Sequence, residues 1–254
     1  MNRLTPRLVG LVVLGSLLFL SPMNRCAEGF LKSGNNGKKP RIIFILVDMS
    51  GSTNQARQTV YREAFGKIYP SLDQGDRILV GTITGRSFIN FKPAVDVEIP
   101  KKSLWMNRIQ FERKLTETKD TIREEVEKLL SQKKGTARTE ILNSLNIADT
   151  IFHDDRRRKV LVILSDMIQD SRDYNFARIN VTEDYIDRVI HDRYEHKLIP
   201  NLKDVKVYVA GASGKDPAKF RSVERFWSRY FGKSGADFSP HRYGHSLISF
   251  EKES

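Results

Sequence analysis

The chain has 254 residues, of which 39% are hydrophobic and 29% are charged, so it can bury the core of one ordinary domain beneath a highly charged surface. Its single cysteine, Cys26, excludes an internal disulfide. The 43 Lys and Arg outnumber the 31 Asp and Glu, which gives a net charge of +12. Because these charges are scattered rather than blocked, we interpret the excess as a determinant of solubility. Anionic lipid, nucleic acid and acidic polymers are the alternative explanations.

The first 40 residues predict an export segment followed by a linker. A basic stretch, 1–7, precedes an uninterrupted apolar run at 8–20. This length suits a signal peptide better than a spanning helix, which needs about 20 residues. We therefore expect 1–27 to be a signal peptide or an uncleaved N-terminal membrane anchor. Residues 28–40 are polar and Gly-rich and are predicted to be a linker to a domain at 41–254. The protein is expected in the periplasm, the cell envelope or the extracellular space.

The first element of the domain is predicted to be a central strand. The stretch "RIIFILVD", 41–48, is apolar at successive positions, as expected of a parallel strand that is covered on both faces. The segment that follows places Val60, Ala64 and Ile68 four residues apart, which predicts a helix with one buried stripe.

The remaining chain alternates between strands and helices. Further strands are predicted at 76–84, 94–100, 159–166 and 205–211, with a short one in 242–250. Further helices are predicted at 120–130, 139–152, 181–193 and 219–235. Only 94–100 alternates apolar and polar residues, so it is expected at an edge of the sheet. The pattern predicts an α/β fold of three layers, with a mostly parallel central sheet, helices on both faces and one antiparallel edge strand.

Two of the predicted strands end in an aspartate, Asp48 and Asp166. The carboxyl ends of parallel strands meet at one edge of a sheet, and two neighbouring carboxylates need a shared proton or a cation. After Asp48, Ser50 and Ser52 offer hydroxyl oxygens at alternate positions, and Gly51 allows a tight turn. Hard divalent cations prefer oxygen ligands, and Mg²⁺ keeps several waters beside one or two carboxylates. The predicted ligand set is Asp48, Ser50, Ser52 and Asp166.

The stretches "DMSGST", 48–53, and "LVILSDM", 161–167, resemble the metal-ion-dependent adhesion site of von Willebrand factor A domains. The resemblance covers roughly residues 40–250. It implies that a threonine joins the ligands, and "RTEILNSL" indicates Thr139, with Thr136 as the alternative. It also implies that Asp166 takes the place of the family's distal aspartate, which either binds the ion directly or contacts the groups that bind it.

The function implied by this resemblance is binding rather than catalysis. One position on the ion would remain for water or for an acidic residue of a protein partner. The expected ion is Mg²⁺, with Mn²⁺ or Ca²⁺ as alternatives, and no nucleic acid is expected as a partner. The loop 167–178, which carries Tyr174 and Phe176, is predicted to contact the partner.

Other interpretations of the same residues stay open. Asp48 and the serines could simply cap a helix, but capping does not explain Asp166. A metal-dependent phosphohydrolase would use Asp48 as its nucleophile, yet Ser50 stands where such enzymes carry a second acid. The third alternative is a basic scaffold for nucleic acid or anionic membrane. The stretch "GASGKD", 211–216, lacks the spacing of a phosphate loop and is predicted to be a strand-to-helix turn. The histidines form no convincing zinc site.

Overall fold

The computed structural model of the protein describes residues 39–50, 55–85, 91–132 and 137–251, all of which belong to one compact unit, Lys39–Ser254. The predicted export segment lies outside the described residues, as do the candidate ligand Ser52 and Thr136, the alternative to Thr139. A search of the described residues finds no helix with the length and apolar character needed to cross a membrane.

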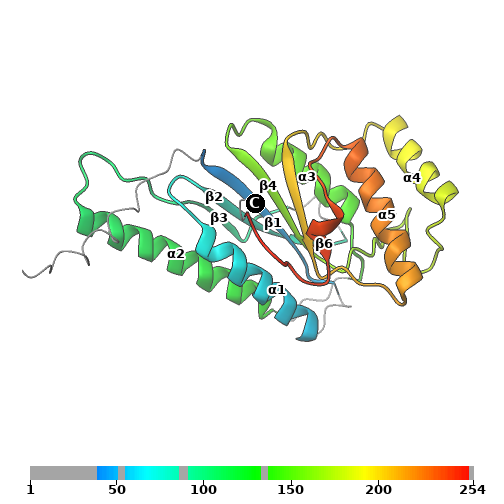
Figure 1. Ribbon diagram of the computed structural model, residues 1–254, viewed down its shortest axis with the longest axis horizontal. Helices are drawn as coiled ribbons and strands as arrows, with labels where there is room; N and C mark the ends of the chain where they lie inside the picture. Colours follow the sequence, from blue (N-terminus) through cyan, green and yellow to red (C-terminus); the bar gives the residue numbers. More distant parts are fainter. Residues whose placement is uncertain (1–38, 51–54, 86–90, 133–136, 252–254) are drawn as a thin grey trace, which may run out of the picture. The chain divides into compact units, whose positions relative to one another are not determined.

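Within the described residues, six strands form one sheet in the order β3-β2-β1-β4-β5-β6 (Figure 1). The strands are β1 (Arg41–Asp48), β2 (Arg77–Ile83), β3 (Val95–Glu98), β4 (Arg158–Leu164), β5 (Val205–Ala210) and β6 (Tyr243–Gly244). All neighbours pair in parallel except β3, which pairs antiparallel with β2 at the edge. This topology confirms the predicted mostly parallel sheet with one antiparallel edge strand.

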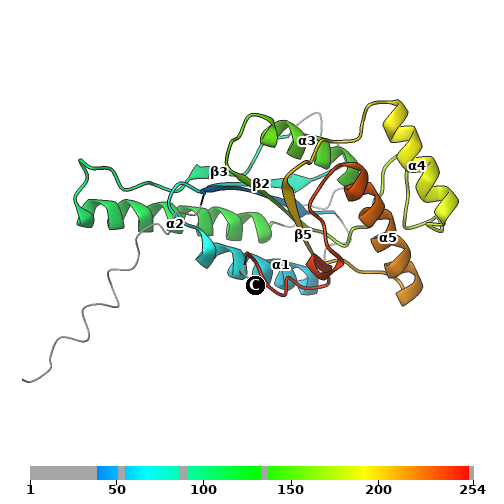
Figure 2. The same cartoon turned by 45° about the horizontal axis from the view of Figure 1, so that its top comes forward.

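Helices cover both faces of the sheet (Figure 2). They are α1 (Gln55–Ile68), α2 (Arg108–Leu130), α3 (Ile141–His153), α4 (Glu183–Glu195) and α5 (Pro217–Lys233). Side chains of β1 alternate between the two faces: Phe44 packs in the cluster with α3, α4 and α5, whereas Ile45 packs in the cluster with α1 and α2. All eight residues of β1 are buried, which explains its continuous apolar run and confirms the three layers.

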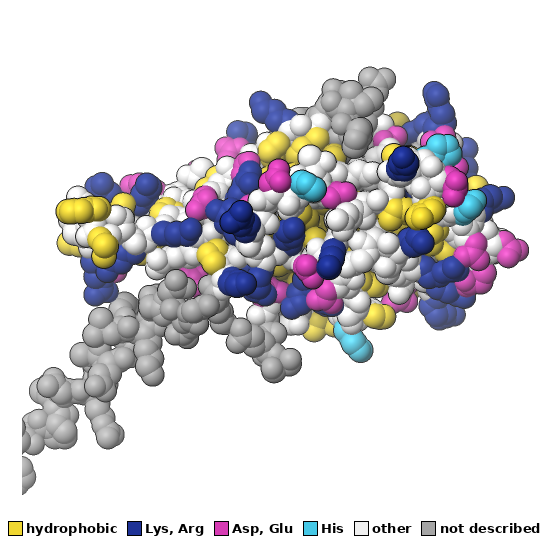
Figure 3. All heavy atoms as spheres, turned by 90° about the horizontal axis from the view of Figure 1, so that it is seen from above, with side chains coloured by type: hydrophobic (Ala, Val, Ile, Leu, Met, Phe, Trp, Pro, Cys, Tyr) yellow, Lys and Arg dark blue, Asp and Glu magenta, His cyan; other side chains and the backbone are white. Residues whose placement is uncertain are grey.

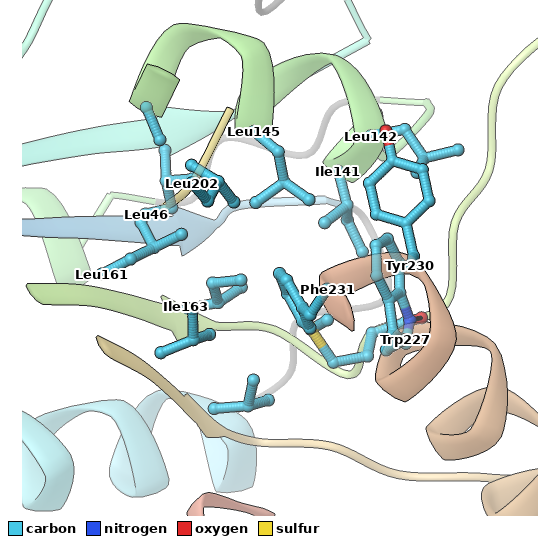
Figure 4. Packing of buried hydrophobic residues seen from close by; sticks show 14 of the residues in the cluster. Leu46, Ile141, Leu142, Leu145, Leu161, Ile163, Leu202, Trp227, Tyr230 and Phe231 are labelled. Carbon is cyan, nitrogen blue, oxygen red and sulfur yellow. Dashed lines mark hydrogen bonds between the residues drawn. The ribbon is translucent and has the colours of Figure 1, made fainter. Parts of the chain in front are cut away.

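The helix α5 contributes an aromatic layer to the core. Phe226, Trp227 and Tyr230 are each fully buried, and Phe226 and Tyr230 stack with ring centroids 5.8 Å apart. Figure 4 shows Trp227 and Tyr230 in one packed layer with leucines of α3. The aromatic face of this helix is therefore a structural element of the core.

The helix α2 differs from its prediction. It begins at Arg108, twelve residues before the predicted start at 120. Its buried side chains lie mostly in its last third, from Ile122 onward, whereas much of its first half is exposed. A helix that packs along only part of its length shows no apolar stripe in the remainder, so hydrophobic periodicity misses that remainder. Asn107 caps the true start, because its side chain accepts a hydrogen bond from the backbone N–H of Gln110 at 2.9 Å.

A buried ion pair fixes the amino end of β1. Asp76 accepts hydrogen bonds from the backbone N–H of Arg41 at 2.7 Å, from Nε of Arg41 at 3.1 Å and from the backbone N–H of Asp73 at 3.0 Å. We expect Asp76→Ala to lower the free energy of unfolding by about 3 kcal/mol or more, because it leaves a guanidinium buried without its partner.

The matched control is Asp96→Ala, which removes one of the two acidic partners of Arg77, in a half-exposed pair at the same edge of the sheet. Its expected cost is below about 1 kcal/mol. Urea denaturation of both variants measures the difference, and equal costs would contradict the role given to Asp76.

Candidate functional site

The order of the strands places a crevice between the ends of β1 and β4. From β1 the chain builds β2 and β3 on one side of the sheet and then crosses to β4 on the other side. At such a switch point the connections leave the sheet in opposite directions, and ligands of open α/β sheets bind there, outside the carboxyl ends of the strands. Val47 pairs with Leu164, so Asp48 and Asp166 follow neighbouring strands to this edge.

Asp48 is completely buried and its carboxylate is held from two directions. Its Oδ1 accepts a hydrogen bond from the backbone N–H of Ser50 at 2.9 Å, and its Oδ2 accepts one from the hydroxyl of Ser165 at 2.8 Å. The Ser165 hydroxyl also accepts a hydrogen bond from the backbone N–H of Met167 at 3.0 Å. Ser165 therefore ties the end of β1 to the turn after β4 and orients the carboxylate.

Asp166 lies beside Asp48 and is also largely buried. Its Oδ1 accepts a hydrogen bond from the backbone N–H of Ile168 at 2.9 Å, and its Oδ2 pairs with the guanidinium of Arg57 on α1 at 3.0 Å. Burial raises the pKa of Asp166 above its ordinary value, Arg57 lowers it, and the negative charge of Asp48 raises it again. The two carboxylates are thus close enough to repel each other.

The turn after Asp166 is held in an unusual backbone conformation. Met167 has a φ of 65°, which is rare for a residue with a side chain. Its carbonyl accepts a hydrogen bond from the indole N–H of Trp227 at 2.9 Å, and its side chain is fully buried. Contacts with the core therefore fix this left-handed turn, and with it the direction in which Asp166 leaves β4.

Thr139 reaches the same edge of the sheet from the start of α3. Its backbone N–H donates to the carbonyl of Asp170 at 2.9 Å, and its carbonyl accepts from the N–H of Asp170 at the same distance. Three residues after Thr139, in the first turn of α3, the backbone N–H of Leu142 donates a hydrogen bond to the side-chain oxygen of the buried Gln169 at 3.1 Å. This contact satisfies one of the N–H groups that a helix leaves without an internal partner in its first turn.

Ser50, Thr139 and Asp166 come from three separate parts of the chain, and all three line one pocket of about 560 Å³. Asp48 is buried beside them through its contacts with Ser50 and Ser165. The other residues that line the pocket are Ala137, Ile168, Asp170, Ala177, Ser213, Gly214 and Lys215. The structure therefore brings together four of the five predicted ligands, and the fifth, Ser52, lies outside the described residues.

Hydroxyl and carboxylate oxygens line this pocket. Where the structure describes the chain, no three His, Cys, Asp or Glu side chains gather as a metal cluster would require. The predicted ligands gathered here are the carboxylates of Asp48 and Asp166 and the hydroxyls of Ser50 and Thr139, all of them hard oxygen donors, and Asp170 adds a further carboxylate to the lining. This donor set fits a hard divalent cation such as Mg²⁺ and does not suit a soft metal.

The loop 167–178 is only partly the exposed surface that its composition indicates. Phe176 is fully buried, and its ring packs against Phe226 with centroids 4.6 Å apart. The ring of Phe176 therefore anchors the loop to the core, and the contact of the loop with a partner stays a prediction. Tyr174 is half-buried, and its hydroxyl donates to Asp192.

Several residues of the site escape a search for motifs. Ser165 precedes Asp166 in the sequence and could have been recognised as its neighbour, but Arg57 and Gln169 carry no local signal. Lys215 belongs to the stretch that fails as a phosphate loop, and the structure confirms a strand-to-helix turn there, because α5 begins at Pro217. Lys215 nevertheless lies at the pocket as an exposed cation.

No family model matches the chain, and no curated protein matches it either. Similar solved structures include the manganese-loaded TRAP protein of Plasmodium vivax, with 12% identity and a TM-score of 0.41 over 81% of this chain and 68% of that one. A von Willebrand factor type A structure from Catenulispora acidiphila shows 13% identity and a TM-score of 0.40 over 78% of this chain. The pilus adhesin SpaC of Lactobacillus rhamnosus GG, in its open conformation, shows 13% and 0.40 over 77%.

The chain spans 42% of the Catenulispora structure and 27% of SpaC, so both are much longer than the matched part. The Catenulispora structure bears the name of the family that the sequence resembles. At TM-scores of 0.40 and 0.41 these similarities carry no argument about function, and the case for a site rests on the geometry of the pocket.

The contact between Gln169 and α3 gives a test of how Thr139 is positioned. We expect Gln169→Ala to cost about 1–3 kcal/mol of stability, because it leaves the buried N–H of Leu142 without an acceptor. Hydrogen exchange at the amide of Leu142 should become faster than in the native chain. Gln169→Glu keeps an acceptor oxygen and should retain the protection. Unchanged exchange in Gln169→Ala would contradict this role.

Proposed function

We propose that this protein binds a partner protein through a divalent cation held at the carboxyl edge of the sheet. The observation that carries the proposal is the convergence of Ser50, Thr139 and Asp166 on one pocket beside the buried Asp48. Ser50 precedes Thr139 by 89 residues and Thr139 precedes Asp166 by 27, and a helix cap does not require such a gathering.

The chain's own residues support the proposal in three ways. Ser165 and the backbone N–H of Ser50 hold the carboxylate of Asp48 in one orientation, so that little reordering is needed when an ion binds. The paired hydrogen bonds between Thr139 and Asp170 hold the start of α3 against the segment after β4. Burial and, to a lesser extent, the negative charge of Asp48 raise the pKa of Asp166, and a cation in the pocket would offset both effects.

A bound ion would supply the attraction for an acidic group of the partner. Asp48, Ser50, Ser52 and Thr139 would hold it directly or through water, and Asp166 would bind it or orient the inner ligands. The exposed Lys215 at the pocket adds a second positive charge toward an incoming carboxylate. We take Mg²⁺ as the resident ion and Mn²⁺ as a convenient probe.

The place of action that we propose is outside the cytoplasm. It rests on the basic stretch and the apolar run at 8–20, which have the order and length of an export signal. The domain belongs, on this proposal, to the von Willebrand factor A type and acts as an adhesion or assembly module rather than as an enzyme.

The first test is calorimetric titration with Mn²⁺. We expect Asp48→Ala to weaken binding at least about a hundredfold, and Ser165→Ala, which removes the hydrogen bonds to Asp48 and from Met167 but no proposed ligand, to weaken it by about 10- to 100-fold. Asp170→Asn is the matched control, since Asp170 lines the same pocket but is outside the proposed ligand set. It should change affinity only a few-fold. Equal losses in Asp48→Ala and Asp170→Asn would show that general charge, and not a defined ligand set, attracts the ion.

The second test concerns the threonine and the partner. Thr139→Ala should weaken Mn²⁺ binding and Thr136→Ala should not. Chelation should release from the full chain any partner that is bound through the ion. The phosphohydrolase alternative predicts metal-dependent hydrolysis of p-nitrophenyl phosphate that disappears in Asp48→Ala. Such hydrolysis would overturn the proposal of a binding module.

A further inference from the structure

A group of large apolar side chains lies exposed at the start of α2. Leu104 is 101% exposed, Trp105 is 96% exposed and Ile109 is 79% exposed. Water-exposed apolar residues are common one at a time, but three large ones within six positions form a patch that indicates an interaction site. We call residues 101–114 the α2 tip.

The α2 tip is an ordered feature and not a loose loop. The backbone N–H of Met106 donates to the carbonyl of Ser103 at 3.1 Å, which closes a turn with Leu104 and Trp105 at its two central positions. Turns ordinarily carry Gly, Pro, Asn, Asp or Ser there. Asn107 then caps α2 directly after the turn. The chain therefore presents two large apolar side chains at the corner of a fixed turn.

Positive charge surrounds these apolar side chains. Residues 101–114 contain five Lys or Arg and one Glu. Arg108 pairs with Glu112 at 2.7 Å, and Lys101 pairs with Glu98 at 3.7 Å. Lys102 and Lys114 are exposed cations of the same segment. Figure 3 shows hydrophobic side chains gathered with Lys and Arg at the end of the molecule where α2 begins.

The α2 tip projects from the edge of the sheet opposite to the candidate site. In the antiparallel pair, Glu98 at the end of β3 lies beside Arg77 at the start of β2, so the chain leaves β3 at the amino edge of the parallel strands. Figures 1 and 2 show the start of α2 lying beyond the strands. The chain also enters the domain at this edge, because β1 begins at Arg41.

We propose that the α2 tip docks on an anionic lipid surface, with Leu104 and Trp105 in the interfacial layer and the surrounding cations on the headgroups. Tryptophan favours the membrane interface, and each Lys or Arg near an anionic surface adds to the attraction. Convex apolar side chains on a narrow projection suit a soft surface into which they can sink. The linker at 28–40 can extend at most about 45 Å, which would keep the domain close to a membrane that holds an uncleaved anchor.

The experiment uses the full chain with vesicles, and Trp105 as its own probe. The other tryptophan, Trp227, is fully buried and donates to Met167, so the difference between the native chain and Trp105→Phe isolates the signal of Trp105. With vesicles of phosphatidylcholine and 30% phosphatidylglycerol, this signal should shift to the blue. It should also lose its quenching by iodide and gain quenching by brominated lipid.

With vesicles of phosphatidylcholine alone, Trp105 should remain accessible to iodide even when the N-terminal segment holds the chain on the vesicle. Trp105 that stays accessible on anionic vesicles overturns the proposal. Protection of Trp105 without lipid, increasing with protein concentration, overturns it in favour of a second copy of the chain.

Matched variants separate the tip from the overall charge of +12. Lys101→Gln with Lys102→Gln should lower the ratio of lipid-protected to iodide-accessible Trp105 by about 25-fold, from about fivefold for each cation. Arg172→Gln with Arg221→Gln removes the same charge from two exposed residues toward the other edge and should change the ratio less than twofold. Equal effects would overturn a role for the tip. Lys101→Gln with Lys102→Gln should leave Mn²⁺ affinity unchanged, which keeps this test independent of the proposed metal site.

Discussion

Two carboxylates that follow neighbouring parallel strands, Asp48 and Asp166, are buried side by side, and the site is organised around the charge that they share. Ser165 donates to one of them, and Arg57 reaches the other from α1. The indole of Trp227 holds the turn that follows Asp166. Side chains of β1 pack in a core on each face of the sheet, which makes this arrangement rigid. Neither β1 nor β4 can slip by one residue without moving its side chains to the opposite face.

The direction of the strands also separates the functions that we propose. The pocket lies at the carboxyl edge of the sheet, whereas the α2 tip and the start of β1 lie at the amino edge. A domain that rests on a membrane by its amino edge would present the pocket toward the solution. The antiparallel pairing of β3 is essential to this separation, because a parallel β3 would have ended at the same edge as the pocket.

The sequence predicts the layers better than the surfaces. The segments that end at Asp48 and Asp166 are apolar because both of their faces are buried, and this pattern is visible in the amino-acid sequence alone. The first half of α2 packs against little, so no periodicity marks it, and its start was predicted twelve residues late. Thr139 was identified by resemblance; it lies at the pocket, and its role as a ligand stays a prediction. The burial of Phe176, the ion pair of Arg57 and the cap supplied by Gln169 depend on which distant segments meet, and no local pattern contains that information.

The ion pair between Arg57 and Asp166 has a consequence for which ions the pocket can keep. The guanidinium is tethered to α1, so it competes with any incoming cation at a fixed and high effective concentration. A sodium or potassium ion brings no more charge than Arg57 already supplies, whereas a magnesium or manganese ion brings twice as much. If the pocket binds a cation as we propose, Arg57 would disfavour monovalent ions there relative to divalent ones, and without an ion it balances the charge of Asp166.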